Sequence, residues 1–267
     1  MTDSNHLEHA VADLMRQVSA EVILPRYRNL AAHEVVEKAA NELVTIADRE
    51  SEDRLSEGLA KLLPEARIIG EEACAADAAL LNGLGDGLVW IIDPIDGTGN
   101  FAAGRPPFGV MIALAEGGVA IAGWILDPLT GRLCHAARGR GARVDGERVQ
   151  ARESGAAVPV AGISTLFIDS DQRADLERRA EGRLDIVPIP RCAAEQYPRV
   201  AFGVNDLALF NRTLAWDHAA GVLFLNEAGG VAARLDGSRY RVDSDELGLL
   251  AAASPAMWEK SARILFG

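Results

Sequence analysis

Residues 90–101 read WIIDPIDGTGNF and place two aspartates and a glycine-rich turn at the end of an apolar strand. Asp, Pro and Gly all favour turns, so a single aspartate would need no further explanation. Pro94, however, fixes its own φ and holds Asp93 and Asp96 near one another. Two carboxylates about 4 Å apart repel by about 4 kcal/mol at an effective dielectric constant of 20. A divalent cation would turn that repulsion into binding.

The chemistry around these aspartates favours a hard cation beside an anion site. Oxygen ligands without His or Cys favour Mg²⁺, then Mn²⁺, and disfavour zinc. Residues 97–100 follow with unhindered backbone N–H groups and the hydroxyl of Thr98. A nest or helix N-terminus there would bind an oxyanion, whereas the alternative is a plain glycine-rich turn.

Two further acidic motifs stand beside apolar segments. Gly70-Glu71-Glu72 follows the apolar pair Ile68-Ile69, and Trp216-Asp217-His218-Ala219-Ala220-Gly221 opens an apolar helix. Asp217 has an alternative role as the N-cap of that helix, and both roles can coexist. His218 lies about 100° around the helix from Asp217, which favours a structural or surface role over that of a general base.

The composition restricts the partners of the protein. The 267 residues predict one large domain or two small ones, and 49% hydrophobic with 25% charged residues is ordinary globular usage. The net charge of −12 disfavours nucleic acid, because an acidic surface repels a polyphosphate backbone. A small anionic substrate would therefore need positive charge at its site, and a bound metal supplies it.

The cysteines and the N-terminus predict the compartment. Cys74, Cys134 and Cys192 are odd in number and lack CxxC spacing, which disfavours disulfides and structural zinc. Residues 1–5 do not resemble a signal peptide, and no apolar run approaches the roughly 20 residues of a membrane span. We expect a cytoplasmic protein that does not bind a membrane.

Hydrophobic periodicity and turn residues predict two differently built halves. The Ala/Gly/Arg-rich stretch 148–157 is the expected boundary between residues 1–150, with an antiparallel sheet, and residues 151–267, which alternate strand and helix. Together they predict one compact unit, a mixed αβ layered sandwich with two sheets. The expected helices cover residues 7–25, 48–63, 171–181, 192–202 and 217–228 and the end of the chain from 255; the expected strands cover residues 67–70, 88–93, 108–115, 119–126, 132–137, 142–144, 148–150, 158–164, 184–189 and 249–253.

The three acidic motifs together resemble those of the inositol monophosphatase family of metal-dependent phosphatases. Residues 42–48 (ELVTIAD) and 139–142 (GRGA) agree more weakly, and the order is right over nearly the whole chain. The resemblance implies a layered α-β-α-β-α sandwich, shared with fructose-bisphosphatases, in a homodimer that is often inhibited by lithium. It also implies hydrolysis of a small phosphorylated metabolite with two or three Mg²⁺ ions.

The resemblance also assigns roles to particular residues. Glu71, Asp93 and the carbonyl of Ile95 would hold one metal, and Asp93, Asp96 and Asp217 a second. A third, weaker ion would lie near Glu71. Gly97 and Thr98 would bind the phosphate, while Asp48 with Thr98 would activate the attacking water. Lys38 is similar to the lysine that the family has upstream of the segment corresponding to residues 42–48.

The substrate end of the pattern departs from the family. Gly99 stands where a second threonine is common, and Phe210 replaces a glutamate that contacts sugar hydroxyls in inositol-hydrolysing members. Residues 191–194 (RCAA) resemble a substrate wall in which Ala193 touches the substrate, and the polar residues 195–197 that follow, including Gln196, could reach the pocket instead.

Three functions remain open on the sequence alone. The first is a Mg²⁺-dependent phosphatase for a small polyol, sugar or amino-alcohol phosphate, including histidinol phosphate, acting by direct attack of water. The second is a 3′-nucleotide phosphatase or fructose-bisphosphatase, which would need extra basic or lid residues. The third is a regulatory binding protein, which is disfavoured because every metal carboxylate is present.

Overall fold

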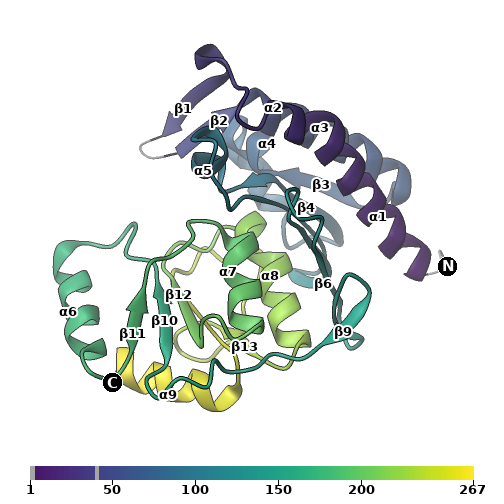
Figure 1. Ribbon diagram of the computed structural model, residues 1–267. Helices are drawn as coiled ribbons and strands as arrows, with labels where there is room; N and C mark the ends of the chain where they lie inside the picture. Colours follow the sequence, from purple (N-terminus) through teal and green to yellow (C-terminus); the bar gives the residue numbers. More distant parts are fainter. Residues whose placement is uncertain (1–3, 40–41) are drawn as a thin grey trace.

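The protein is built from five layers in the order helix, sheet, helix, sheet, helix (Figure 1). The computed structural model describes residues 4–39 and 42–267. Each sheet is apolar on both faces and is therefore covered on both faces by helices. This architecture is the α-β-α-β-α sandwich that the sequence predicts.

The six predicted helices each match a helical segment to within a few residues, whereas the helix at 71–76 and the 3₁₀ turns at 32–34 and 78–83 were not predicted. Helix α3 follows a Thr45 N-cap and ends before Pro64, and the first helical segment continues through Pro25 and ends at Arg26. None of the described helices combines the length and apolar composition that a membrane span requires. The α-helices are α1 (Ser4–Val18), α2 (Leu24–Arg26), α3 (Ile46–Leu62), α4 (Glu71–Ala76), α5 (Thr98–Ala102), α6 (Ser170–Ala180), α7 (Ala193–Ala201), α8 (Ala215–Glu227) and α9 (Pro255–Leu265), with the π-helical turn η1 (Ser19–Ile23) and the 3₁₀ turns η2 (Ala32–Glu34) and η3 (Ala78–Gly83).

The seven-stranded sheet has the strand order β3-β4-β5-β6-β7-β8-β9. Only the β3–β4 pair is parallel, and the others form the predicted antiparallel meander. Asp145 and Gly146 both have positive φ, as a two-residue hairpin turn requires. The strands are β3 (Arg67–Gly70), β4 (Leu88–Asp96), β5 (Gly109–Glu116), β6 (Val119–Leu126), β7 (Leu133–Ala137), β8 (Gly141–Val144) and β9 (Glu147–Val149).

The five-stranded sheet has the order β11-β10-β12-β14-β13, with β10 parallel to both β11 and β12. The sequence predicts three of its strands and misses β12 and β13. It also misses the hairpin of β1 (Val35–Ala39) and β2 (Glu42–Thr45), which is separate from both sheets. The strands of this sheet are β10 (Val160–Ile163), β11 (Asp185–Val187), β12 (Leu207–Phe210), β13 (Val231–Ala233) and β14 (Leu249–Ala252).

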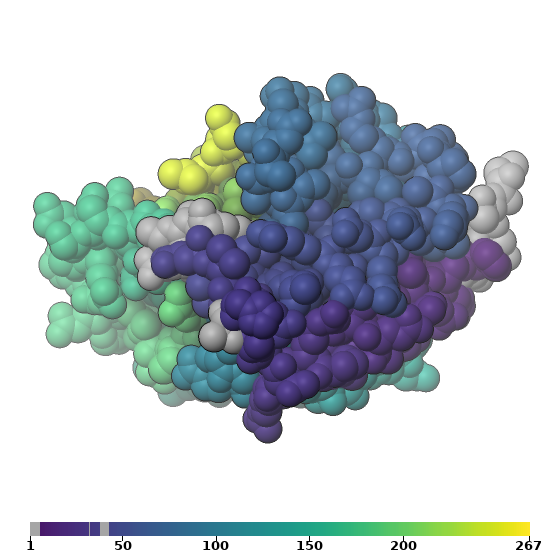
Figure 2. Space-filling view, turned by 90° about the horizontal axis from the view of Figure 1, so that it is seen from above, coloured from purple at the N-terminus to yellow at the C-terminus, as the bar shows by residue number. Residues whose placement is uncertain are grey.

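Three apolar clusters join the layers. Helices α1 and α3 pack on the outer face of the larger sheet around Trp90 and Trp124, and α6 and α9 cover the outer face of the smaller one. The purple and blue residues of the first of these layers make up most of the face in Figure 2. Between the sheets, α7 and α8 approach so closely that a Cβ at Gly221 would lie 2.0 Å from the Tyr197 ring. This tight contact holds α8 against α7, and a second one holds α8 against the larger sheet, because a Cβ at Gly123 of β6 would lie 2.9 Å from the Cα of Ala220.

Candidate active site

A cavity of about 570 Å³ lies between the two sheets, and residues from all three acidic motifs line it. The end of β4, the loop after it, the start of α7 and the start of α8 all contribute to its wall. Every residue that the sequence predicts as a metal ligand lines this cavity: Glu71, Asp93, Ile95, Asp96 and Asp217.

Asp93 and Asp96 point to the same side because β4 is irregular between them. Three positions apart on a regular strand, their side chains would face opposite ways. Opposite them on β5, however, Asp93 pairs with Met111 and Asp96 with Gly109, which are only two positions apart. The extra residue forms a bulge around Pro94, and both carboxylates therefore face the cavity.

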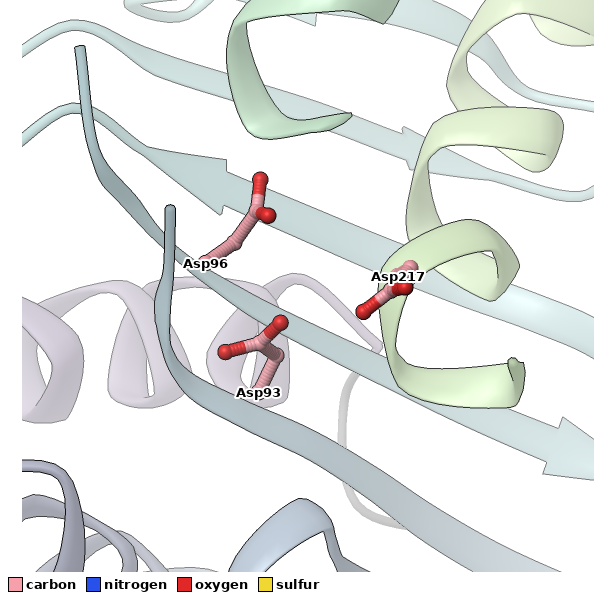
Figure 3. A group of neighbouring side chains, drawn as sticks. All are labelled: Asp93, Asp96 and Asp217. Carbon is pink, nitrogen blue, oxygen red and sulfur yellow. The ribbon is translucent and has the colours of Figure 1, made fainter. Parts of the chain in front are cut away.

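Asp217 completes the cluster from the first turn of α8. Carboxylate oxygens of Asp93, Asp96 and Asp217 all lie within 4.8 Å of one another, and the three side chains converge in Figure 3. The alternative role of Asp217 as an N-cap is wrong. The helix begins at Ala215 with Leu214 as its N-cap, so Asp217 lies inside the first turn and its carboxylate is directed at the cavity.

The cluster is electrostatically unfavourable without a counter-ion. Burial raises the pKa of Asp93 well above its usual value, and the charges of Glu71 and Asp96 raise it further. Burial likewise raises the pKa of Asp96 to about 6 and that of Asp217 well above its usual value. Among the described residues, the buried Oδ1 of Asp93 has no hydrogen-bond partner. The cluster therefore offers oxygen atoms alone, and these are buried and crowded. One of them has no hydrogen-bond partner. Such a set of ligands fits a hard divalent cation.

The loop after β4 turns directly into a short helix beside the cluster. Gly97 has a φ of 83°, and a Cβ there would lie 3.1 Å from the carbonyl oxygen of Pro107, so only glycine fits. Helix α5 begins at Thr98, so the N–H groups of Thr98 and Gly99 precede the helical hydrogen bonds, whereas those of Asn100 and Phe101 donate to the carbonyl oxygen of Gly97 at 2.8 and 3.1 Å. The predicted glycine-rich anion loop is thus a helix start beside the carboxylates.

Asp48 reaches this loop from the first turn of α3. Its Oδ2 accepts the N–H and the hydroxyl of Thr45 at 2.8 and 2.6 Å. The Thr98 hydroxyl lies 3.1 Å from Oδ1 of Asp48 and 2.9 Å from the carbonyl oxygen of Ile95. Burial raises the pKa of Asp48 to about 7, so this carboxyl changes protonation near neutral pH. The predicted pair of Asp48 and Thr98 is therefore in direct contact.

Glu52 is a buried acid at the site that the sequence reasoning missed. Its carboxylate accepts the backbone N–H groups of Glu72 and Ala73, both at 2.8 Å, and so caps the start of α4 where Glu71 stands. Burial raises the pKa of Glu52 to about 7. Its position four residues after Asp48, on the apolar face of α3, was the available signal.

The substrate end of the cavity contains Ala193, Gln196 and Phe210. Gln196 is buried and its Nε2 donates to Asn205 at 3.1 Å. Phe210 stacks on Tyr197 with ring centroids 5.2 Å apart. Of the polar segment 195–197, only Gln196 lines the cavity. The side chain of Lys38 lies outside the described part of the structure.

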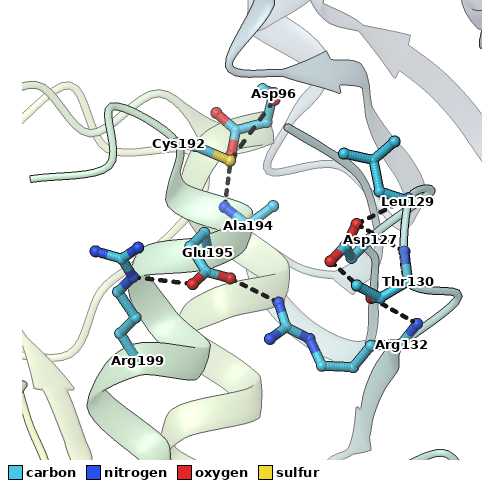
Figure 4. Close-up of polar contacts among 9 residues, drawn as sticks. All are labelled: Asp96, Asp127, Leu129, Thr130, Arg132, Cys192, Ala194, Glu195 and Arg199. Carbon is cyan, nitrogen blue, oxygen red and sulfur yellow. Dashed lines mark hydrogen bonds and ion pairs between the residues drawn. The ribbon is translucent and has the colours of Figure 1, made fainter. Parts of the chain in front are cut away.

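The neighbours of Gln196 are held away from the cavity. Figure 4 shows Glu195 in ion pairs with Arg132 and Arg199, at 2.7 and 2.9 Å. The expectation that Glu195 and Tyr197 could line the pocket is therefore wrong, because one is paired with arginines and the other is fully buried beneath Phe210.

His218 has the structural role that the sequence favours. Its ring nitrogens lie 2.7 Å from the Tyr197 hydroxyl and 3.1 Å from the carbonyl oxygen of Arg212. Burial lowers the pKa of His218 to about 3. The imidazole is therefore neutral at physiological pH and tied to the layer between the sheets, not to the surface.

Comparison with known proteins agrees with this geometry. The model of the inositol monophosphatase family matches residues 4–265. The chain belongs to the inositol monophosphatase family. A fructose-1,6-bisphosphatase/inositol-1-monophosphatase from Aquifex aeolicus is 30% identical over 83% of both chains. A histidinol-phosphatase from Mycobacterium tuberculosis is 36% identical over 73% of this chain and 75% of its own.

A solved structure extends the match to the fold. An inositol monophosphatase from Thermotoga maritima superposes with a TM-score of 0.78, 25% identity and coverage of 97% and 98% of the two chains. As a member of the inositol monophosphatase family, the protein is a phosphoric monoester hydrolase from a family of metal-dependent phosphatases. All three motifs of the predicted resemblance meet in the cavity described above.

Proposed function

We propose that the protein hydrolyses a small phosphate monoester in a Mg²⁺-dependent reaction, with Mn²⁺ as a substitute. The observation that carries this proposal is the convergence of Asp93, Asp96 and Asp217 within 4.8 Å, with one buried oxygen of Asp93 unpartnered. Glu71 and the carbonyl of Ile95 would complete sites for two or three ions. When bound, the ions neutralise phosphate oxygens, lower the pKa of water and stabilise the leaving alkoxide.

The residues of the chain itself would bind the phosphate and orient the water. The N–H groups at Gly97 and Thr98, with Asp96 and Asp217 close by, surround the place for the phosphate. Asp48 and Thr98 would hold the attacking water, and the 3.1 Å distance between the Thr98 hydroxyl and Oδ1 of Asp48 supports their acting as a pair.

We propose direct attack of water without a covalent intermediate. Cys192 is the one cysteine among the described residues of the cavity wall. Burial raises the pKa of its thiol well above the usual value, and the nearby Asp96 raises it further. A thiol kept protonated is a poor nucleophile, so the cavity lacks an activated cysteine. Inversion of configuration at phosphorus is the stereochemical result that a single displacement gives.

The substrate side favours an ester other than inositol monophosphate. Phe210 offers an apolar ring where the family resemblance places a hydroxyl-binding glutamate, so a polyol would lose hydrogen bonds there. Sugar phosphates, histidinol phosphate, 3′-nucleotides and fructose bisphosphate are the remaining substrates to compare. We also propose a location in the cytoplasm, which the three free, buried cysteines support. A homodimer is proposed from the family resemblance alone.

The test is phosphate release from a panel of phosphorylated metabolites with and without Mg²⁺. The matched variant is Asp93→Asn, which keeps the volume of the side chain and removes its charge. Mg²⁺-dependent release by the wild type and a loss of at least about 100-fold in the variant would support the enzyme. Release by neither protein on any substrate would favour the regulatory binding protein instead.

A further inference from the structure

Two arginines line the same cavity as the carboxylates. Arg105 and Arg191 are both exposed, and among the described residues neither guanidinium forms an ion pair. Nearby Arg132 and Arg199, by contrast, both form ion pairs with Glu195. In a protein with a net charge of −12, two unpaired cations at an anion-binding site require an explanation.

Asn100 brings the two arginines to the same side of the phosphate loop. Its carbonyl accepts the N–H of Arg105 at 2.9 Å. Its side-chain amide donates to the carbonyl oxygens of Pro107 and Pro190, at 2.8 and 2.9 Å. The segments that carry Arg105 and Arg191 are thereby fixed next to residues 97–100, although they lie 86 positions apart in the chain.

The backbone at Arg191 is in the left-handed region, with a φ of 54°. Glycine adopts this conformation without strain, whereas a side chain with a Cβ does so at a cost. Such strained positions cluster at ligand-binding sites, where the side chain has a use that offsets the strain. At Arg191, the guanidinium lies in the cavity wall, where it can bind an anion.

The rest of the outer wall does not cancel this positive charge. Arg212 also lines the cavity and lies 4.4 Å above the centre of the Phe167 ring. Glu37 is the one acid of the described lining outside the predicted metal ligands, and it already has an interaction partner. Phe210 adds an uncharged surface. Away from the carboxylate cluster, the charged groups of the described wall are therefore mainly cationic.

We propose that Arg105 and Arg191 bind a second anionic group of the substrate, so that the preferred ester carries a phosphate or carboxylate on its alcohol part. This inference rests on the proposed phosphatase function and narrows its substrate class. Guanidinium groups bind both anions with directed, charge-assisted hydrogen bonds. The same charges disfavour esters whose alcohol part carries an ammonium group.

The test compares n-alkyl phosphates of three to six carbons that differ only in the terminal group: hydroxyl, carboxylate, phosphate or ammonium. Values of kcat/KM are measured at fixed free Mg²⁺ for the wild type, Arg105→Gln, Arg191→Gln and the double variant. Arg143→Gln is the matched control, because Arg143 is exposed on β8 and outside the cavity lining. Binding of propane-1,3-diphosphonate and of propylphosphonate is measured by calorimetry on the same proteins.

We expect the wild type to prefer a terminal phosphate or carboxylate over a hydroxyl at least tenfold at its best chain length, and the ammonium ester to be the poorest. The double variant should reduce that preference at least tenfold and lose the tighter binding of the diphosphonate, while Arg143→Gln keeps both. The relative rates of the carboxylate and phosphate esters identify which anion the subsite takes. Equal kcat/KM for all terminal groups, or a preference that survives the double substitution, would overturn the inference.

The two proposals fail in distinguishable ways. Hydrolysis of the hydroxyl-terminated ester without discrimination would leave the phosphatase intact and remove the second anion site. Hydrolysis of no ester would overturn the proposed function. In that case the binding of the diphosphonate still tests the arginines. If the wild type and the double variant bind it with equal affinity, the proposed second anion site is overturned as well.

Discussion

Oδ2 of Asp96 accepts the backbone N–H of Ala194 at 2.5 Å and so joins the end of β4 to the first turn of α7 (Figure 4). One predicted metal ligand thereby also connects the larger sheet to the helices between the sheets. The two roles make different demands on the side chain, because the hydrogen bond needs an acceptor while the metal needs a negative charge.

Asp96→Asn separates these roles. An asparagine oxygen can still accept from Ala194, and one of the crowded like charges is removed. Without metal, we expect a free energy of unfolding within about 1 kcal/mol of the wild type or above it. The increase in Tm that Mg²⁺ gives the wild type should disappear. Thermal unfolding with EDTA and with Mg²⁺ measures both effects, and an unchanged Mg²⁺ response would contradict the assignment of Asp96 as a ligand.

Glu52 is expected to stabilise the segment that presents Glu71. Glu52→Ala leaves the N–H groups of Glu72 and Ala73 without their acceptor and opens a cavity, so the free energy of unfolding should fall by about 2–4 kcal/mol. Glu52→Gln keeps one acceptor and should lose less than half as much. Urea unfolding gives the free energies. Equal losses in the two variants would show that the hydrogen bonds to α4 are not what Glu52 contributes.

The metal-free protein should lose stability as the pH rises. Asp48 and Glu52 have pKa values of about 7 in the folded protein, against ordinary values of 3.8 and 4.5. The folded state therefore holds these protons where the unfolded state has released them. The resulting stabilisation is complete below about pH 4 and is lost by about pH 7.

Urea unfolding in EDTA at pH 5 and pH 7.5 tests this sign. We expect the free energy of unfolding to fall by the order of 3 kcal/mol for each group between these limits. Asp48→Asn and Glu52→Gln should each flatten the pH profile, since an amide does not titrate. A variant profile parallel to that of the wild type would show that the substituted carboxyl does not titrate in this range.

Arg191→Gly is expected to raise stability while it weakens the second anion site. Relief of the left-handed backbone should add about 1 kcal/mol, or roughly 2–4 °C in Tm for a chain of this size. Arg191→Gln keeps a Cβ and should not gain this stability. Differential scanning calorimetry of both variants decides the point. A lower Tm for the glycine variant would mean that the arginine side chain stabilises the loop and that strain is not its main effect.

Local patterns predicted most of the larger sheet. The β6 range follows from an apolar run between the turn residues Gly117-Gly118 and 127–131, and the β8–β9 hairpin follows from the Asp145-Gly146 turn; neither needs a distant partner. The β1–β2 hairpin was missed because residues 35–45 mix strand-favouring Val and Thr with Glu, Lys and Ala and show no clear alternation, so their strand conformation depends on pairing with each other.

The same limit applies to the site. The carboxylates at Asp93, Asp96 and Asp217 belong to recognisable motifs, so the sequence predicted them. Arg105 belongs to no recognised motif, and Arg191 begins the predicted substrate wall at residues 191–194, but neither arginine was predicted to bind an anion. The fold, with the hydrogen bonds of Asn100, brings their segments to one cavity. That residues 1–150 and 151–267 form one compact unit remains a prediction.

Anomalous diffraction from crystals grown with Mn²⁺ tests the central claim most directly, since Mn²⁺ accepts the same oxygen ligands as Mg²⁺ and scatters anomalously. The proposal predicts at least one strong anomalous peak bounded by carboxylate oxygens of Asp93, Asp96 and Asp217, and its loss in Asp93→Asn. A fully occupied Mn²⁺ elsewhere with none among these three aspartates would contradict the proposal that they form the metal centre of a phosphatase.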